Sequence, residues 1–241
     1  MKAKPKHFIP NLFTLTNMFL GFLAIGLILN DEPLKAGTLI FIASLLDAFD
    51  GKIARLLGIE SRFGVEFDSM ADTISFCVVP SILIYNIYIE GLHPLLGSAI
   101  SFMPIMFGTI RLARFNIDQD LKLPKSYTIG LTTPISTITL FSYLIYNYNR
   151  FENYGDPRTA LILLSFLCFL MVSPIHFPKF PIFSFNSGRK NSFVLSLFLL
   201  TLFFMLIFKG LFLLPITLLF ISWNIISWIL LSNKNQMEIK N

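Results

Sequence analysis

Four aspartates lie within two neighbouring segments of this chain that are otherwise apolar enough to cross a membrane. They are Asp47, Asp50, Asp68 and Asp72. A charged side chain at the bilayer centre costs roughly 3 kcal/mol or more, depending on the reference state. Four carboxylates at helical spacing would be hard to keep there unless a cation bound between them. The pattern therefore predicts a divalent metal site.

The composition is that of a membrane protein. Apolar residues make up 54% of the 241 residues and charged residues only 14%. We expect an all-α integral membrane protein, a polytopic bundle of about eight transmembrane helices, since each apolar segment is long enough to cross the hydrocarbon layer. A single transmembrane domain would cover residues 1–241. The expected helices run near residues 8–29, 34–56, 65–89, 94–115, 128–148, 159–175, 192–208 and 211–232.

The distribution of basic residues predicts the orientation. Eight spans would place both termini on one side, and that side would hold 15 of the 19 lysines and arginines. The positive-inside rule makes this side cytoplasmic. We therefore expect a multi-pass protein of the cell (inner) membrane, with both termini and the aspartate cluster facing the cytoplasm. The net charge of +5 then reflects topology and anionic lipid head groups, and no nucleic-acid partner is expected.

The spacing of the aspartates indicates how they could work together. Asp47 and Asp50 are i, i+3 on one helix, and Asp68 and Asp72 are i, i+4 on the next, so each pair shares a helix face. A short connection makes the two helices antiparallel neighbours. Four carboxylates facing one another suit hard cations such as Mg²⁺ or Mn²⁺. Two such ions a few ångströms apart could clamp a phosphoryl centre.

Three neighbouring residues favour a phosphate-containing ligand. Gly51 removes a side chain where a ligand could approach the backbone, and Gly64 allows a close helix crossing. Arg55 falls near the face of Asp47, where a guanidinium can bind phosphate in a bidentate way. The alternative is an acidic cluster for passage of metal ions or protons, as in a transporter. Placement of all four aspartates near one membrane face weighs against it.

These residues also carry a resemblance. The pattern Asp47-x2-Asp50-Gly51-x2-Ala54-Arg55-x8-Gly64-x3-Asp68-x3-Asp72 resembles the signature of the CDP-alcohol phosphatidyltransferases at every fixed position. Members of that family cleave the diphosphate of a CDP-alcohol, join the phosphatidyl group to an alcohol acceptor and release CMP.

Further segments resemble the phosphatidylserine synthase branch of the family. They are Ile9 to Asn17, Phe67 to Thr73, Phe76 to Pro80 and Arg111 to Asn116. The resemblance covers residues 8–180, the expected catalytic core, and leaves residues 192–232 as two extra C-terminal helices. The chain departs from the branch at Cys77, where glycine is usual, and at Thr132, where Gly-Leu-Pro is the usual sequence of residues 130–132.

The resemblance implies a reaction and a role for each matching residue. The phosphatidyl group would pass from CDP-diacylglycerol to the hydroxyl of L-serine, giving phosphatidylserine and CMP. Asp72 would act as general base and would also bind metal, and the enzyme would work as a homodimer among membrane lipids. The metal ligands would be Asp47, Asp50, Asp68 and Asp72; the residues contacting the CDP group would be Asn11, Gly51, Arg55, Ser61 and Gly64.

Two arginines are candidates for binding the acceptor alcohol, whose identity has alternatives. Arg111 and Arg114 stand at the cytoplasmic end of the fourth expected span, where either could bind the serine carboxylate or a lipid phosphate. Their alternative role is positive-inside anchoring. Glycerol 3-phosphate or an inositol phosphate would keep the same chemistry with another acceptor, and each would need an additional cationic pocket.

Overall fold

The apolar segments fold into helices with bounds close to the expected ones. The computed structural model describes residues 8–56, 61–120, 127–178, 196 and 210–240. In chain order the helices are α1 (Phe8–Leu29), α2 (Pro33–Leu56), α3 (Arg62–Thr73), η2 (Ile74–Val78), α4 (Val79–Ile87), α5 (Pro94–Ser101), α6 (Met103–Asp120), α7 (Thr133–Phe151), α8 (Pro157–Val172) and α10 (Leu213–Lys240). The expected helix at 192–208 lies outside the described residues apart from residue 196.

Four of the described helical segments are long and apolar enough to cross a membrane. They are Asn11–Leu29, Arg62–Ile87, Pro94–Ile117 and Leu213–Leu231. The chain is therefore a mostly helical membrane protein, as its composition predicts, and the count of eight spans stays a prediction. Helix α8 is also apolar but is 16 residues long.

Two departures from regular helix affect the region around the aspartates. One turn of π-helix, η2, follows α3 directly after Thr73, and single π turns of this kind occur often at functional sites. Two short strands, β1 (Tyr127–Ile129) and β2 (His176–Pro178), pair antiparallel where the sequence predicts the start of the fifth helix and the end of the sixth. Gly130 follows β1 with a φ of 78°, a left-handed conformation that suits glycine and delays the start of α7.

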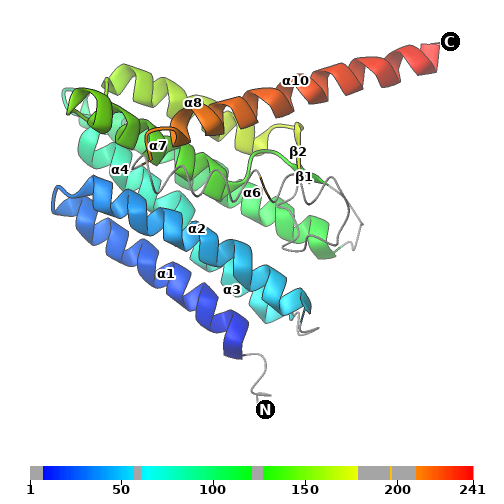
Figure 1. Cartoon of the computed structure of the whole chain (residues 1–241), viewed down its shortest axis with the longest axis horizontal. Coiled ribbons are helices and arrows are strands. Elements are labelled where there is room, and N and C mark those ends of the chain that lie inside the picture. Colours follow the sequence, from blue (N-terminus) through cyan, green and yellow to red (C-terminus); the bar gives the residue numbers. More distant parts are fainter. Residues whose placement is uncertain (1–7, 57–60, 121–126, 179–195, 197–209, 241) are drawn as a thin grey trace.

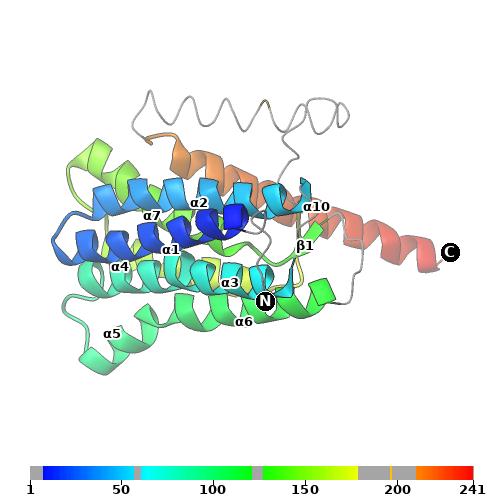
Figure 2. The same ribbon diagram turned by 90° about the horizontal axis from the view of Figure 1, so that it is seen from below.

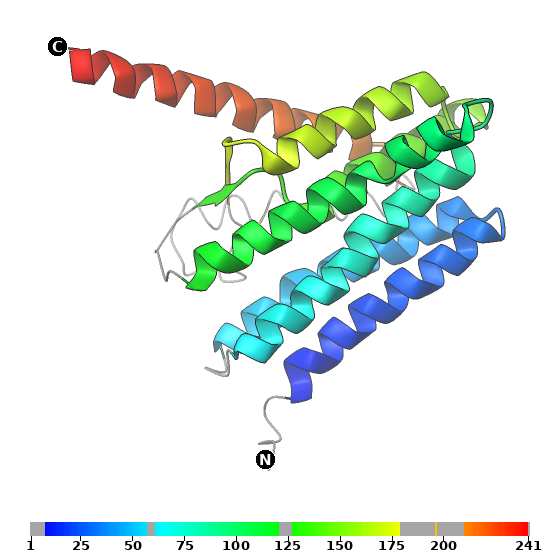
Figure 3. The same cartoon turned by 180° about the vertical axis from the view of Figure 1, so that it is seen from behind.

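The core forms where small and branched side chains of several helices meet. Helices α1 and α2 form the most extensive helix pair, and α7 packs against α2, α8 and α10. The buried side chains include Ala24, Ile28, Ala36, Ile40 and Phe141. Seen from below, α5 and α6 lie along one side of the bundle (Figure 2), and the view from behind shows α10 extending past the bundle toward the C-terminus (Figure 3).

Several helix ends gather at one end of the bundle. The start of α1, the end of α2, the start of α3 and the end of α6 all point the same way, with β1 and β2 nearby (Figure 1). The turn between α1 and α2 and the turn after α4 lie at the opposite end. This topology places the helix ends that carry the motif residues at the same end of the bundle.

Cys77, one departure from the family pattern, packs against a glycine of α6. Cys77 lies fully buried in η2, and Gly108 faces it from α6. A β-carbon at residue 108 would overlap Cys77 Sγ, whereas it would stand 3.4 Å from Cys77 Cβ and from Thr133 Cγ2, which is ordinary contact. The sulfur therefore fills the space that a side chain at residue 108 would need.

This packing predicts compensation between the two positions. Gly108→Ala alone should destabilise the protein by about 1–3 kcal/mol through overpacking. The double variant Cys77→Ala, Gly108→Ala removes the sulfur and should recover most of that loss. Thermal unfolding in detergent measures both. Gly26→Ala is the matched control, since within the described residues nothing lies within 4 Å of a β-carbon there. Equal instability of the single and double variants would contradict the packing.

Candidate metal and substrate site

Three of the four expected metal ligands come together between α2 and α3. Asp47 on α2 and Asp68 and Asp72 on α3 each offer a carboxylate oxygen, and these oxygens all lie within 4.8 Å of one another. Ser61 directly precedes α3, and its hydroxyl accepts a hydrogen bond from the Gly64 amide at 3.0 Å and caps the helix. The backbone of Asp50 is part of α2, and its side chain lies outside the described part of the structure.

The burial of these carboxylates fits a bound cation. Asp72 is 8% exposed, and its Oδ1 has no hydrogen-bond partner among the described residues. Asp47 and Asp68 are half-buried. Carboxylates packed this closely repel one another, and a buried anion without a partner is costly. Oxygen ligands in such an arrangement suit a hard divalent ion, so the cluster could hold a metal.

Arg111 lies beside this cluster. It extends from α6, is 6% exposed, and donates from Nη1 to Thr133 Oγ1 of α7 at 3.3 Å. Its guanidinium stands 5.7 Å from the ring centroid of Phe115 and within electrostatic range of Asp72 and Asp47. Its Nε has no hydrogen-bond partner in the described ranges of the chain. A buried cation therefore interacts electrostatically with the carboxylates, and one of its donors has no partner among the described residues.

Comparison with known proteins identifies the family. The family model described as CDP-alcohol phosphatidyltransferase matches residues 7–176, which include the aspartates and Arg111. The chain belongs to this family. The sequence resemblance is thereby confirmed, and the family is one whose chemistry depends on a metal.

Several members of the family with assigned functions are similar over most of their length. A Helicobacter pylori (strain 26695) protein named CDP-diacylglycerol–serine O-phosphatidyltransferase is 36% identical over 181 residues, 75% of this chain and 76% of the relative. A Bacillus subtilis (strain 168) protein of the same name is 37% identical over 174 residues, 72% of this chain and 92% of the relative. An archaetidylserine synthase of Methanothermobacter thermautotrophicus is 32% identical over 175 residues, 71% of this chain and 70% of the relative.

In this family member, the guanidinium of Arg114 donates hydrogen bonds to three backbone carbonyls. Its Nη1 donates to the Val172 carbonyl at 3.1 Å, and its Nη2 donates to the carbonyls of Ile129 and Met171 at 3.3 and 3.1 Å. The guanidinium therefore ties the end of α8 to β1. A β-carbon at Gly130 would overlap the Met171 carbonyl oxygen and stand 2.9 Å from Arg114 Nη2, so the absence of a side chain there permits this arrangement.

The expected CDP-binding residues lie at the same end of the bundle as the carboxylates. Ser61 is exposed at the start of α3, Gly64 is half-buried in its first turn, and Asn11 is half-buried in the first turns of α1. Gly51 and Arg55 belong to the last turns of α2, and the Arg55 side chain lies outside the described part. Their contact with CDP stays a prediction.

The structure adds polar residues that the motif does not contain. Thr133 contacts Arg111, and Asn116 of α6 exchanges hydrogen bonds with Ser69 of α3 at 3.0 and 3.1 Å. Asn17 of α1 is fully buried. It lies close to η2, since its backbone carbonyl accepts a hydrogen bond from Ser75 Oγ at 3.0 Å. Asn17 is the last residue of the Ile9 to Asn17 segment that resembles the phosphatidylserine synthase branch, and its polar side chain inside an otherwise apolar span is a further sequence signal.

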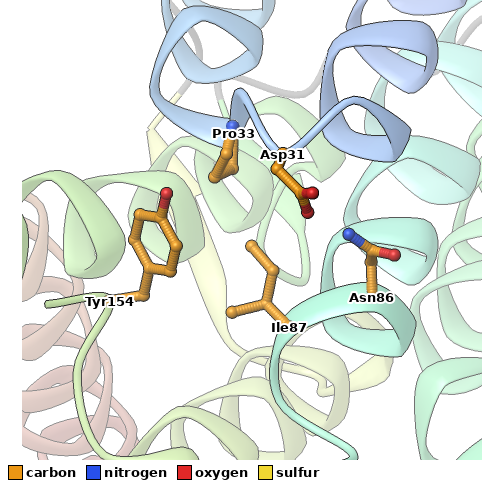
Figure 4. Close-up of a pocket in the computed structure, with 5 residues that line it drawn as sticks. All are labelled: Asp31, Pro33, Asn86, Ile87 and Tyr154. Carbon is orange, nitrogen blue, oxygen red and sulfur yellow. The ribbon is translucent and has the colours of Figure 1, made fainter.

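A cavity of about 190 Å³ lies at the other end of the bundle. It is lined by Asp31, Pro33, Asn86, Ile87 and Tyr154, from the α1–α2 turn, α4 and the α7–α8 connection (Figure 4). The Asn86 amide there donates to the Ile28 carbonyl at 3.1 Å. Because none of the motif residues lines it, the candidate substrate site is the carboxylate cluster and not this hollow.

Proposed function

We propose that this chain transfers the phosphatidyl group of CDP-diacylglycerol to the hydroxyl of L-serine, giving phosphatidylserine and CMP. Membership of the family supports phosphatidyl transfer, and relatives of assigned function are named for serine as the acceptor. The observation that carries the assignment in the structure is the buried guanidinium of Arg111 beside Asp72. An acceptor held there would have its carboxylate on a cation and its hydroxyl near a carboxylate base.

The residues available for metal are the aspartates. Asp47, Asp68 and Asp72 would hold divalent ions, together with Asp50, and we propose two ions, Mg²⁺ or Mn²⁺. Ions bound there would neutralise the diphosphate and the charge that develops during transfer. Asn11, Gly51, Arg55, Ser61 and Gly64 are proposed to contact the CDP group, since they lie at the same end of the bundle.

The chain's own residues provide the proton transfer and the orientation. Asp72 takes the proton of the serine hydroxyl, whose oxygen forms a bond to the phosphatidyl phosphorus while the bond from that phosphorus to the CMP oxygen breaks. The electron pair leaves with CMP. Arg111 holds the serine carboxylate through a charge-assisted hydrogen bond and so fixes the direction of attack. Arg114 positions β1 and the end of α8 around the acceptor through its backbone contacts.

The distribution of basic residues supports a membrane arrangement for this enzyme. We propose a multi-pass protein of the cell membrane whose carboxylate cluster and termini face the cytoplasm, where serine and CMP are soluble. The basic residues of the sequence support this orientation. We also propose a homodimer, as the family resemblance implies.

The proposed acceptor can be tested by release of CMP. Purified protein in detergent is given CDP-diacylglycerol and Mn²⁺ or Mg²⁺, with serine, glycerol 3-phosphate, inositol phosphate or no acceptor. We expect release that depends on serine and stops when a chelator removes the metal. Faster release with another acceptor would contradict the serine assignment and keep the chemistry. Absence of release from folded protein with every acceptor would contradict the function as a whole.

A further inference from the structure

Asn17 is a fully buried amide whose side chain makes no hydrogen bond within the described part of the chain. It is 0% exposed, and neither Nδ2 nor Oδ1 has a hydrogen-bond partner among the residues that the structure describes. The residue lies in α1, within a segment apolar enough to span a membrane, where a polar group cannot fall back on bulk water. Buried polar groups in proteins are nearly always satisfied, so an amide of this kind needs a reason.

The surroundings of Asn17 place it next to the candidate site. Its carbonyl accepts a hydrogen bond from Ser75 Oγ at 3.0 Å, and a β-carbon at Gly21 would stand 2.9 Å from Ser75 Cα. The two backbones are therefore in close contact here. Ser75 lies three residues after Asp72, about one helical turn deeper into the bundle. Asn17 is thus placed one turn below the carboxylate that we assign as the base.

Two other unused polar atoms belong to the same region. Asp72 Oδ1 and Arg111 Nε are buried and lack a hydrogen-bond partner within the described part of the chain. Asp72 is on α3, Arg111 on α6 and Asn17 on α1, so three helices contribute one unsatisfied group each. A small, strongly polar molecule bound among them would satisfy all three groups at once.

The chemistry of the proposed acceptor matches these groups one by one. Building on the proposed function, we infer that Asn17 binds the ammonium group of the acceptor amino acid and so determines acceptor specificity. The hydroxyl goes to Asp72 and the carboxylate to Arg111, which leaves the ammonium in need of an oxygen ligand. The amide oxygen of Asn17 accepts a hydrogen bond from it without adding another negative charge beside the aspartates.

A residue retained for the ligand should be dispensable for folding. Replacing Asn17 by leucine, which is similar in size, removes a buried polar group that has no partner in the described structure. We expect the melting temperature of Asn17→Leu and Asn17→Ala to equal or exceed that of the wild type. Serine use should fall at the same time, because the interaction with the ammonium is lost. This combination separates a specificity residue from a structural one.

The test compares two acceptors that differ in the amino group. CMP release is measured with serine and with 3-hydroxypropionate, which has the same hydroxyl and carboxylate but no amino group. If 3-hydroxypropionate is not a substrate, its inhibition constant against serine is measured instead. Asn17→Leu should lower kcat/KM for serine roughly 10-fold or more and should change the value for 3-hydroxypropionate less than about threefold. The KM for CDP-diacylglycerol should be unchanged. Ser81→Ala is the matched control, because its hydroxyl on α4 is also buried without a partner among the described residues.

The outcomes distinguish this inference from the proposed function. Equal losses with both acceptors, or Asn17 variants that no longer fold, would overturn the role of Asn17 while leaving serine transfer in place. Wild-type protein that releases no CMP with serine would overturn the proposed function, and the assignment of Asn17 with it.

Discussion

Replacement of Asp72 by asparagine is expected to reduce kcat for serine-dependent CMP release by at least about 10³-fold. General base catalysis alone contributes typically 10²- to 10⁴-fold, and this variant also loses a ligand of the carboxylate cluster. The side chain is nearly isosteric and removes one charge from a set of carboxylate oxygens within 4.8 Å of each other. The protein should therefore fold and should melt at a temperature no lower than the wild type when metal is absent.

A matched control separates this effect from a general loss of negative charge. Glu66 is an exposed carboxylate on the same helix, 3.4 Å from the Asn116 amide and outside the cluster. Glu66→Gln should keep at least about half of the activity, since surface substitutions usually have small effects. If Asp72→Asn retained comparable activity, the assignment of Asp72 as the base would be wrong.

Replacement of Arg111 by glutamine is expected to lower kcat/KM for serine by roughly 10- to 150-fold, which corresponds to the loss of a hydrogen bond to a charged group. Most of the change should appear in KM, because the guanidinium holds the acceptor and takes no part in bond breaking. Arg111→Lys should recover only part of the loss, since an ammonium lacks the planar fork that matches a carboxylate.

The control for Arg111 uses both the protein and the acceptor. Arg150→Gln removes an exposed arginine from the last turn of α7 and should leave the kinetics unchanged. Ethanolamine has no carboxylate, so its use as an acceptor, or its inhibition of serine, should be insensitive to Arg111→Gln. A uniform loss with both acceptors would indicate that Arg111 acts on the phosphate side of the reaction instead.

The sequence predicts the helices and the carboxylate cluster because both depend on local spacing. Asp68 and Asp72 are four residues apart on one helix and so share a face. Helices α2 and α3 both pack against α1, and the carboxylate of Asp47 on α2 meets the other two there. The same reasoning locates the helix ends to within a few residues. It also explains why the family signature is readable without a structure.

The remaining features depend on contacts between distant segments. The sequence offers no reason to assign different roles to Arg111 and Arg114. In the structure, the Arg114 guanidinium donates hydrogen bonds to backbone carbonyls of β1 and α8, whereas Arg111 interacts electrostatically with the aspartates. The strands β1 and β2 are three residues each and join positions about 50 residues apart, so no periodicity predicts them. Asn17 lies outside the aspartate motif, and its position beside η2 is visible only once α1 and α3 are packed together.

The most direct test of the account is the fate of serine itself. Protein reconstituted in liposomes with CDP-diacylglycerol and Mn²⁺ is supplied with ¹³C,¹⁵N-labelled serine, and labelled phosphatidylserine and CMP are quantified by mass spectrometry. The account predicts equal amounts of the two products, formed only with metal and abolished by Asp72→Asn. CMP released without labelled lipid, or labelled lipid formed in the absence of metal, would contradict it.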